Sequence, residues 1–214
     1  MLAVFQLTLS GTLLIYQGQE IGMINAPKDW PMEEYIDMST ERFLQKVRAD
    51  VERLGDKTLL SRAIDGVQRV ARDHARTPMH WDSSTSAGFS TSSKTWYRVM
   101  ESYKEGINVA AQEGDPESVL NFYRRMIALR KKHPDVFVKG LFKLYDRDGD
   151  ETMVFTKTTR NGKRVALAAL NFTERPQPFK VPSEVGDEGE LLLSTVAGTS
   201  KDSLAPFEAR IYLR

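Results

Sequence analysis

Residues 13–22 have the sequence LLIYQGQEIG, and this stretch decides the fold that the chain is predicted to adopt. Its first four residues are large and apolar, and a polar segment follows them directly. A short apolar run without alternation is typical of a strand that is buried on both faces in a parallel sheet covered by helices. In α/β barrels and open α/β sheets, the loops after such strands converge on the ligand site. We therefore predict that residues 13–16 form a barrel strand and that Gln17, Gln19 and Glu20 face a sugar or another polar ligand.

Composition and charge exclude several classes of partner. The chain of 214 residues has 30 Lys and Arg against 29 Asp and Glu, so no excess positive charge indicates binding to nucleic acid or to an anionic membrane. It has no cysteine, which excludes disulfides, a thiol nucleophile and a thiolate metal site within it. We therefore expect no nucleic-acid partner, no membrane partner and a reducing, cytoplasmic location.

The apolar N-terminus has only part of the pattern of a secretory signal. No basic residue precedes the apolar run 2–15, no small-x-small cleavage site follows it, and Gln6, Thr8 and Ser10 interrupt it. The run is also too short and too polar for a membrane span. We therefore expect a buried helix over residues 2–9 that leads into the predicted strand.

Three further segments favour helices. In 40–55 and in 59–72 the apolar residues recur at helical spacing with charged residues between them. A third helix is predicted from Asp115-Pro116, a capping residue followed by a proline at the first helical position, to about Lys132. We expect charged faces in contact with solvent and a structural role for 59–72.

The pattern changes to period two beyond Gly140. Short segments alternate between apolar and polar residues and are separated by turn formers, which is typical of antiparallel strands. The predicted strands are 141–145, 152–158, 164–172, 190–196 and 207–213, with an Asn161-Gly162 hairpin turn between the second and the third. We expect a small antiparallel β-sandwich. Asn171-Phe172-Thr173 is a glycosylation triplet, which matters only in a secreted chain.

The segment 72–82, RDHARTPMHWD, is dense in hydrogen-bonding side chains. Pro78 disfavours helix at Thr77, so a shaped loop is predicted. Arginine beside carboxylates and imidazoles suits a polyhydroxylated ligand, because a planar guanidinium can hold fixed donors against ring hydroxyls or a neighbouring carboxylate. The spacing alone fits a salt-bridged structural loop equally well.

Two patterns invite a metal-site interpretation, and neither is complete. His74 and His80 have no third ligand at a suitable spacing. Residues 146–150, DRDGD, are similar to the start of a calcium loop, but Glu151 stands where that loop needs glycine and Lys157 where it needs glutamate. We therefore predict no metal, and a hairpin turn at 146–150.

Aromatic residues occur in two loops. Trp30 lies in the proline-containing loop 25–31, where it could stack on a sugar or plug the loop onto the scaffold, and we favour the plug. The Ser-, Thr- and Gly-rich segment 83–94 has the composition of a surface loop. We expect Trp96 and Tyr97 to anchor the chain again after that loop.

Three motifs in order give a specific resemblance: YQGQEIGM at 16–23, RDHARTPMHWD at 72–82 and INVAAQ at 107–112. With the closing segment 206–212 they resemble the C-terminal part of an α-glucosidase of the α-amylase superfamily (glycoside hydrolase family thirteen), in the maltase and oligo-1,6-glucosidase branch and most like fungal maltases. The fold implied is an α+β fragment. The last strand and helices of a (β/α)8 barrel would occupy residues 1–134, and a C-terminal antiparallel β-sandwich would occupy 135–214.

The resemblance also implies binding residues. In the family, the arginine of the Ala-Arg-Thr-Pro-Met segment holds the non-reducing glucose together with an aspartate from the start of the barrel. This arginine is Arg76 here, and the aspartate would lie outside the chain. Glu20 would line the neighbouring subsite. His74 and His80 stand where many relatives have Asn and Gln. The expected partner is an oligosaccharide, and no cofactor is expected.

The catalytic residues of the family are not expected in this chain. Members hydrolyse α-glucosidic bonds with retention, using an Asp nucleophile, a Glu acid/base and a second Asp in an Asn-His-Asp segment. That triplet and the other two motifs do not occur in the sequence. We therefore expect a fragment of a retaining α-glucosidase that is inactive alone and carries no catalytic carboxylate. The alternative is a non-catalytic carbohydrate-binding or interaction module.

Overall fold

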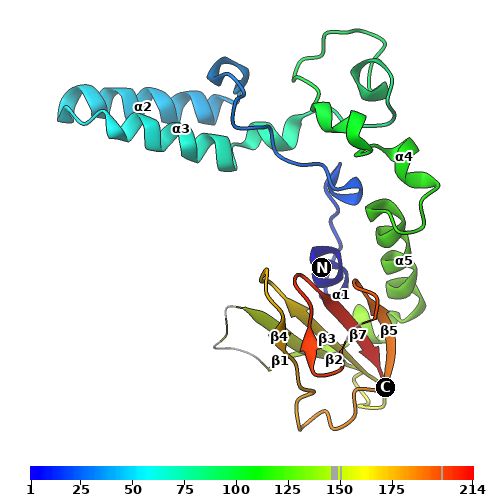
Figure 1. Ribbon diagram of the computed structural model, residues 1–214. Helices are drawn as coiled ribbons and strands as arrows, with labels where there is room; N and C mark the ends of the chain where they lie inside the picture. Colours follow the sequence, from blue (N-terminus) through cyan, green and yellow to red (C-terminus); the bar gives the residue numbers. More distant parts are fainter. Residues whose placement is uncertain (146–148, 150, 199) are drawn as a thin grey trace. The chain divides into compact units, whose positions relative to one another are not determined.

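The computed structural model describes residues 1–145, 149, 151–198 and 200–214 (Figure 1). Four of the excluded positions fall in the calcium-like segment 146–150, so the hairpin predicted there lies outside the described residues. The chain forms two compact units. One, which we call the β-unit, combines residues 1–14 with 123–214, and the other, which we call the helical unit, consists of residues 15–122. The domain boundary between residues 134 and 135, which the resemblance implies, stays a prediction.

The first unit contains an antiparallel sheet in the strand order β1-β2-β3-β7-β5. Its strands are β1 Leu141–Leu144, β2 Thr152–Thr158, β3 Val165–Asn171, β5 Glu190–Ser194 and β7 Ala209–Leu213. All five predicted strands are thereby confirmed to within a few residues. Gly162 adopts a φ of +71° in the turn between β2 and β3, a backbone conformation that favours glycine.

Two further strands were not predicted. β4, Gln177–Pro178, pairs with β6, Ser203–Leu204, in a separate two-stranded sheet. Two residues are too few to produce a recognisable alternation, so periodicity gives no signal for such strands. Leu204 and Phe179 nevertheless pack with Leu167 and Tyr212 of the larger sheet in one core cluster. This packing is the sheet-to-sheet contact expected of a small sandwich.

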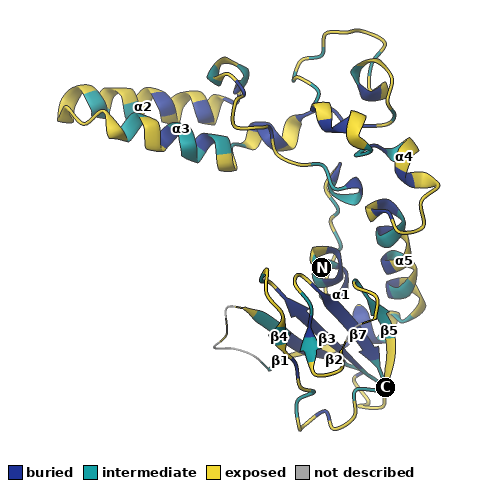
Figure 2. Ribbon diagram, in the orientation of Figure 1, coloured by how far each residue is buried: buried dark blue, intermediate teal, exposed yellow. Residues whose placement is uncertain are grey.

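The N-terminal helix α1, Leu2–Thr8, belongs to this unit and contacts β3 and β7. Val4 and Leu7 are fully buried, and Figure 2 shows most of β3 and β7 in dark blue, the colour of buried residues. The guanidinium of Arg130 donates hydrogen bonds to the carbonyls of Leu7 (2.7 Å), Leu9 (2.7 Å) and Gly11 (3.0 Å). These bonds satisfy carbonyl groups that the end of a helix leaves without partners. The predicted buried helix is confirmed.

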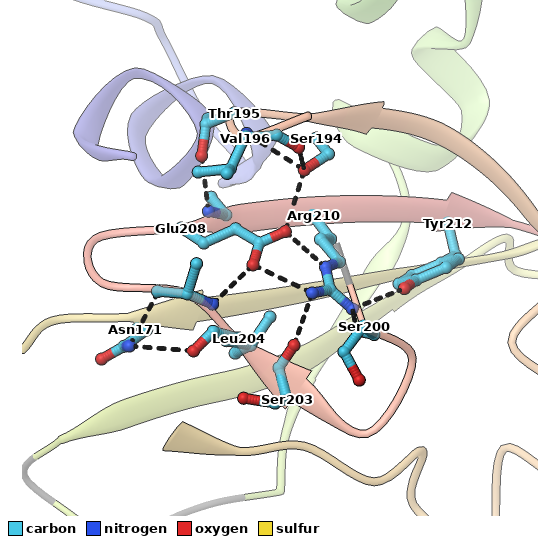
Figure 3. Close-up of polar contacts among 12 residues, drawn as sticks. Asn171, Ser194, Thr195, Val196, Ser200, Ser203, Leu204, Glu208, Arg210 and Tyr212 are labelled. Atoms are coloured by element: carbon cyan, nitrogen blue, oxygen red, sulfur yellow. Dashed lines mark hydrogen bonds and ion pairs between the residues drawn. The ribbon is translucent and has the colours of Figure 1, made fainter. Parts of the chain in front are cut away.

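A buried ion pair lies at the centre of the β-unit (Figure 3). Glu208 and Arg210 are 0% and 1% exposed, and Arg210 Nε donates to Glu208 Oε1 at 2.5 Å. Arg210 also donates to the carbonyls of Ser200 (2.8 Å) and Ser203 (2.5 Å). Burial alone would raise the pKa of Glu208, but hydrogen bonds, above all from Arg210, outweigh it and lower that pKa. The pair is therefore charged and fully hydrogen-bonded.

The glycosylation triplet lies inside this unit. Asn171 is 0% exposed, and its Nδ2 donates to the carbonyls of Arg175 (2.7 Å) and Ala205 (2.9 Å). Glycosylation would modify that nitrogen. The folded chain therefore does not present Asn171 as an acceptor.

The second unit is built on a helical hairpin of α2, Met38–Leu54, and α3, Thr58–Val70. Both predicted helices are confirmed, and Gly55 ends α2 with a φ of +71°. Trp30 is 5% exposed and packs edge-on against Tyr35 at 6.3 Å between ring centroids. Trp30 therefore plugs its loop into the core, as predicted.

Short helices and loops make up the rest of this unit. The 3-10 helices are η1 Gln19–Ile21, η2 Met32–Glu34, η3 Arg72–Arg76, η4 Thr85–Gly88 and η5 Glu101–Glu105, and α4 spans Val109–Glu113. α5, Val119–Lys132, runs from this unit into the other, where α6, Pro134–Phe137, follows it. Among the described residues, no helix is long and apolar enough to cross a membrane.

The prediction of a strand at 13–16 is wrong. These residues belong to no helix or strand, and Leu14 and Tyr16 are 75% and 49% exposed. A parallel strand exists only in a ladder with neighbouring strands, and no described strand pairs with this segment. An apolar run indicates burial but does not supply the partner that buries it.

The predicted start of α5 is also wrong. Asp115 Oδ1 accepts a hydrogen bond from the Glu117 amide (2.9 Å) within a turn, and the helix begins at Val119. Ser118 Oγ accepts from the Asn121 amide at 3.2 Å, which is the bond of a capping residue. Ser118 therefore caps the helix three residues after the position that the Asp-Pro pair indicated.

Candidate functional site

Arg76 stands at the end of η3, where the sequence stops the helix. Thr77 adopts an extended conformation (φ −65°, ψ 147°), as expected of a residue before proline. Arg76 Nη1 forms an ion pair with Asp37 Oδ2. The side chain of Arg76 is 37% exposed, whereas that of Asp37 is 5% exposed. The guanidinium is therefore held on one side by a buried carboxylate and remains accessible on the other.

Asp37 is fixed in turn by two further interactions. Its Oδ1 accepts from the Ser39 amide at 2.8 Å and caps the N-terminus of α2. Its own amide donates to Asp73 Oδ1 at 2.8 Å. The carboxylate that pairs with Arg76 is thus tied both to a helix and to the segment that carries Arg76.

Asp73 connects this pair to a third segment of the chain. It is 0% exposed, and its Oδ2 accepts from Thr40 Oγ1 at 3.0 Å. The hydroxyl of Tyr97 donates to Asp73 Oδ1 at 3.3 Å. We call the connected residues Arg76, Asp37, Asp73 and Tyr97 the Arg76 network.

Three members of the network, Arg76, Asp37 and Tyr97, border a cleft of about 950 Å³, which we call the Arg76 cleft. Its other lining residues are Tyr16, Gln17, Ile36, Met38, Ser39, Arg42, Arg72 and Trp96. The cleft combines guanidinium donors, a carboxylate, an amide and aromatic faces. Such a set of a few convergent polar groups beside apolar surface suits a polyhydroxylated ligand.

Glu20 lies outside this lining. It is part of η1, and its buried Oε2 finds no hydrogen-bond partner among the described residues. The same segment contributes Tyr16 and Gln17 to the cleft instead. The structure thus brings Gln17 to Arg76 but not Glu20, and the binding role of either Glu20 or Arg76 stays a prediction.

The two histidines of the Arg76 segment act as packing residues. His74 Nδ1 accepts from the Ala26 amide at 3.1 Å, and its ring lies edge-on to Tyr35 at 5.6 Å between centroids. His80 is 0% exposed and its Nδ1 lies 2.8 Å from the Ile107 carbonyl, so Nδ1 carries the proton. Burial lowers the pKa of His80. Within the described residues, no group of three His, Asp or Glu could hold a metal ion.

Sequence reasoning did not connect two members of the Arg76 network, Asp37 and Tyr97, with Arg76. Asp37 and Tyr97 lie 39 and 21 residues from Arg76 in the sequence, and no motif joins them to it. The resemblance placed the aspartate partner of Arg76 outside the chain, whereas the structure shows a partner inside it. The Asp-x-Ser spacing at 37–39 does signal a helix cap, but not its second role as an ion-pair partner.

Comparison with known proteins gives consistent matches. A family model described as "Alpha amylase, catalytic domain" matches residues 1–140. An α-glucosidase of Candida albicans is 42% identical over 213 residues, which cover 99% of this chain and 36% of that protein. An oligo-1,6-glucosidase of Saccharomyces cerevisiae, IMA3, is 37% identical over 221 residues, with 100% of this chain and 36% of that protein covered.

A solved structure agrees with these relatives. The trehalulose synthase MutB from Pseudomonas mesoacidophila matches with a TM-score of 0.87 and 31% identity over 100% of this chain and 37% of that chain. A variant of MutB has been crystallised with its substrate sucrose. The chain thus spans about a third of the length of the relatives that it matches.

Proposed function

Because this chain belongs to the alpha-amylase family, we propose that it is part of a retaining α-glucosidase that removes terminal α-linked glucose from maltose- or isomaltose-type oligosaccharides. In this proposal the chain supplies substrate-binding groups and the C-terminal β-unit. We also propose a cytoplasmic location, which rests on the absence of cysteine from the sequence.

The observation that carries this proposal is the half-exposed guanidinium of Arg76 within the Arg76 network. Asp37 fixes one side of the guanidinium, and the other side faces a cleft large enough for more than one sugar ring. Fixed donors of this kind hold the hydroxyl groups of a sugar in one orientation, which prepares the glycosidic bond for attack. Arg76 would therefore position the terminal glucose without reacting with it.

Bond cleavage would require groups that we do not assign to this chain. Retention needs a nucleophilic carboxylate and an acid/base carboxyl about 5 Å apart on opposite sides of the scissile bond. Asp37 and Asp73 are the carboxylates nearest to Arg76 in the network, but Asp37 pairs with that arginine and Asp73 is 0% exposed. We infer that neither serves as nucleophile and that the chain alone is inactive.

A binding experiment tests this proposal. The full chain is titrated with maltose and isomaltose in a calorimeter, alongside Arg76→Ala, Arg76→Lys and the control Arg53→Ala, which lies outside the cleft. Arg76→Ala should weaken binding at least about tenfold, the effect of losing a charged hydrogen-bond donor. Arg76→Lys keeps the positive charge but not the planar guanidinium, so its affinity for the disaccharides should lie between those of the unmodified chain and Arg76→Ala.

Two results would contradict the proposal. The first is an unmodified chain that binds neither disaccharide, or one whose binding Arg76→Ala leaves unchanged. The second concerns inactivity: turnover of p-nitrophenyl α-glucoside above that of a buffer blank, retained through repurification, would show that a carboxylate pair is present after all.

A further inference from the structure

Trp96 is the most exposed large apolar side chain in the described part of the molecule. It is 89% exposed, whereas Trp30 and Trp81 are 5% and 51% exposed. The expectation that Trp96 anchors its loop is therefore wrong, since only its neighbour Tyr97 makes an anchoring hydrogen bond. An indole left in water forgoes the stabilisation that burial would bring and stays available for contact with a ligand.

Trp96 borders two clefts at once. One is the Arg76 cleft, and the other is a cleft of about 630 Å³. Ile36 and Tyr97 also line both. Trp96 therefore lies where the two clefts adjoin and could contact a ligand that extends from Arg76 into the second cleft.

The backbone that follows Trp96 is held in place. Thr95 Oγ1 donates to the Tyr97 carbonyl at 2.6 Å, and the Tyr97 hydroxyl is part of the Arg76 network. Arg98 pairs with Glu34 at 3.2 Å and lies over the ring of Trp30 at 5.5 Å. The indole is thus exposed on a segment that is anchored by the two residues directly after it, which is the arrangement of a preformed contact surface.

The second cleft has the chemistry of a site for a neutral polar ligand. Its charged residues are of both signs, with Glu33, Glu34 and Glu101 against Lys94 and Arg98. No field of one sign favours an anion or a cation there. The remaining polar groups are hydroxyls and can exchange hydrogen bonds with a sugar. They are Thr85, Ser86, Ser93, Thr95, Tyr97 and Tyr103.

We propose that Trp96 is a stacking platform for the sugar units beyond the terminal glucose of an α-linked oligosaccharide. The inference rests on the proposed function, which places that glucose at Arg76. The C–H face of a pyranose ring carries partial positive charge and packs on the electron-rich face of indole, while its hydroxyl groups point outward to polar neighbours. Trp96 therefore determines the preferred length of the bound sugar, and Arg76 determines that its end is glucose.

A length series tests this assignment. The full chain is titrated calorimetrically with glucose, maltose and maltotriose, together with Trp96→Ala, Trp96→Phe and the control Trp81→Phe, which lines neither cleft. Affinity of the unmodified chain should rise with sugar length. Trp96→Ala should bind maltotriose about five- to tenfold more weakly, a loss of roughly 1–1.4 kcal/mol, and should weaken the binding of glucose much less. Trp96→Phe should retain most of the length dependence, and Trp81→Phe all of it.

Each other outcome is decisive. Length-dependent binding that Trp96→Ala leaves intact overturns the role of Trp96 but not the proposed function. An equal loss for glucose and maltotriose also overturns it, because it indicates a general structural effect. An unmodified chain that binds no sugar overturns the proposed function and this assignment together. Since Trp96 is 89% exposed, its replacement should leave the thermal unfolding of the chain unchanged, which verifies folding.

Discussion

The two units of the chain each contain an arginine–carboxylate pair, and the pairs differ in what surrounds them. In the β-unit, Arg210 and Glu208 are 1% and 0% exposed, and neighbouring carbonyl, hydroxyl and amide groups complete their hydrogen bonds (Figure 3). In the helical unit, Asp37 is equally buried, but Arg76 is 37% exposed and borders a cleft. An arginine whose N–H donors all form hydrogen bonds within the fold has only a structural role. An arginine with N–H donors that face a cleft can also bind a ligand.

The largest effect should follow from breaking the buried pair. Glu208→Gln leaves Arg210 charged and buried without its counter-ion, which costs roughly 3–5 kcal/mol of unfolding free energy. Urea unfolding followed by far-UV circular dichroism measures the loss. The matched control is Glu184→Gln, since Glu184 pairs with Lys143 at an exposed site where a salt bridge contributes little. Equal effects of the two substitutions would contradict a structural role for the buried pair.

A smaller effect on stability, with a larger effect on binding, should follow at Asp37. Asp37→Asn removes the charge that holds Arg76 but keeps a good helix cap, so unfolding free energy should fall by at most about 1 kcal/mol. Binding of maltose should nevertheless weaken several-fold, because Arg76 loses its fixed orientation. Asp37→Ala removes the cap as well and should cost about 1 kcal/mol more.

Calorimetric titration and urea unfolding of the same two Asp37 variants separate these effects. If Asp37→Asn destabilised the chain as much as Glu208→Gln while the binding of maltose stayed unchanged, the proposed difference between the two pairs would be contradicted. The pair at Arg76 would then be structural, and the exposed part of the guanidinium would have no function.

The sequence predicted elements whose signal is local. Helices at 40–55 and 59–72 and the strands after Gly140 were found, because periodicity and turn residues act within a few positions. The strand predicted at 13–16 is not present in the structure, because an apolar run specifies burial while a strand also needs a partner ladder. The Arg76 segment was recognised as polar, but its contacts with Asp37 and Tyr97 could not be predicted, because these two residues come from distant parts of the sequence.

The smallest effect should be a pH dependence that is confined to the helical unit. Burial lowers the pKa of His80, so the unfolded chain binds a proton at a higher pH than the folded chain does. The contribution of neutral His80 to stability is therefore complete above the unfolded pKa of about 6.5 and is lost as the pH falls toward the folded pKa.

All three tryptophans lie within residues 15–122, so tryptophan fluorescence reports the unfolding of this unit alone. Its urea midpoint should decrease below about pH 6.5. His80→Asn, whose side-chain amide corresponds in position to Nδ1 and can donate to the Ile107 carbonyl, should remove most of that decrease. An unchanged decrease in the variant would assign the pH dependence to another group.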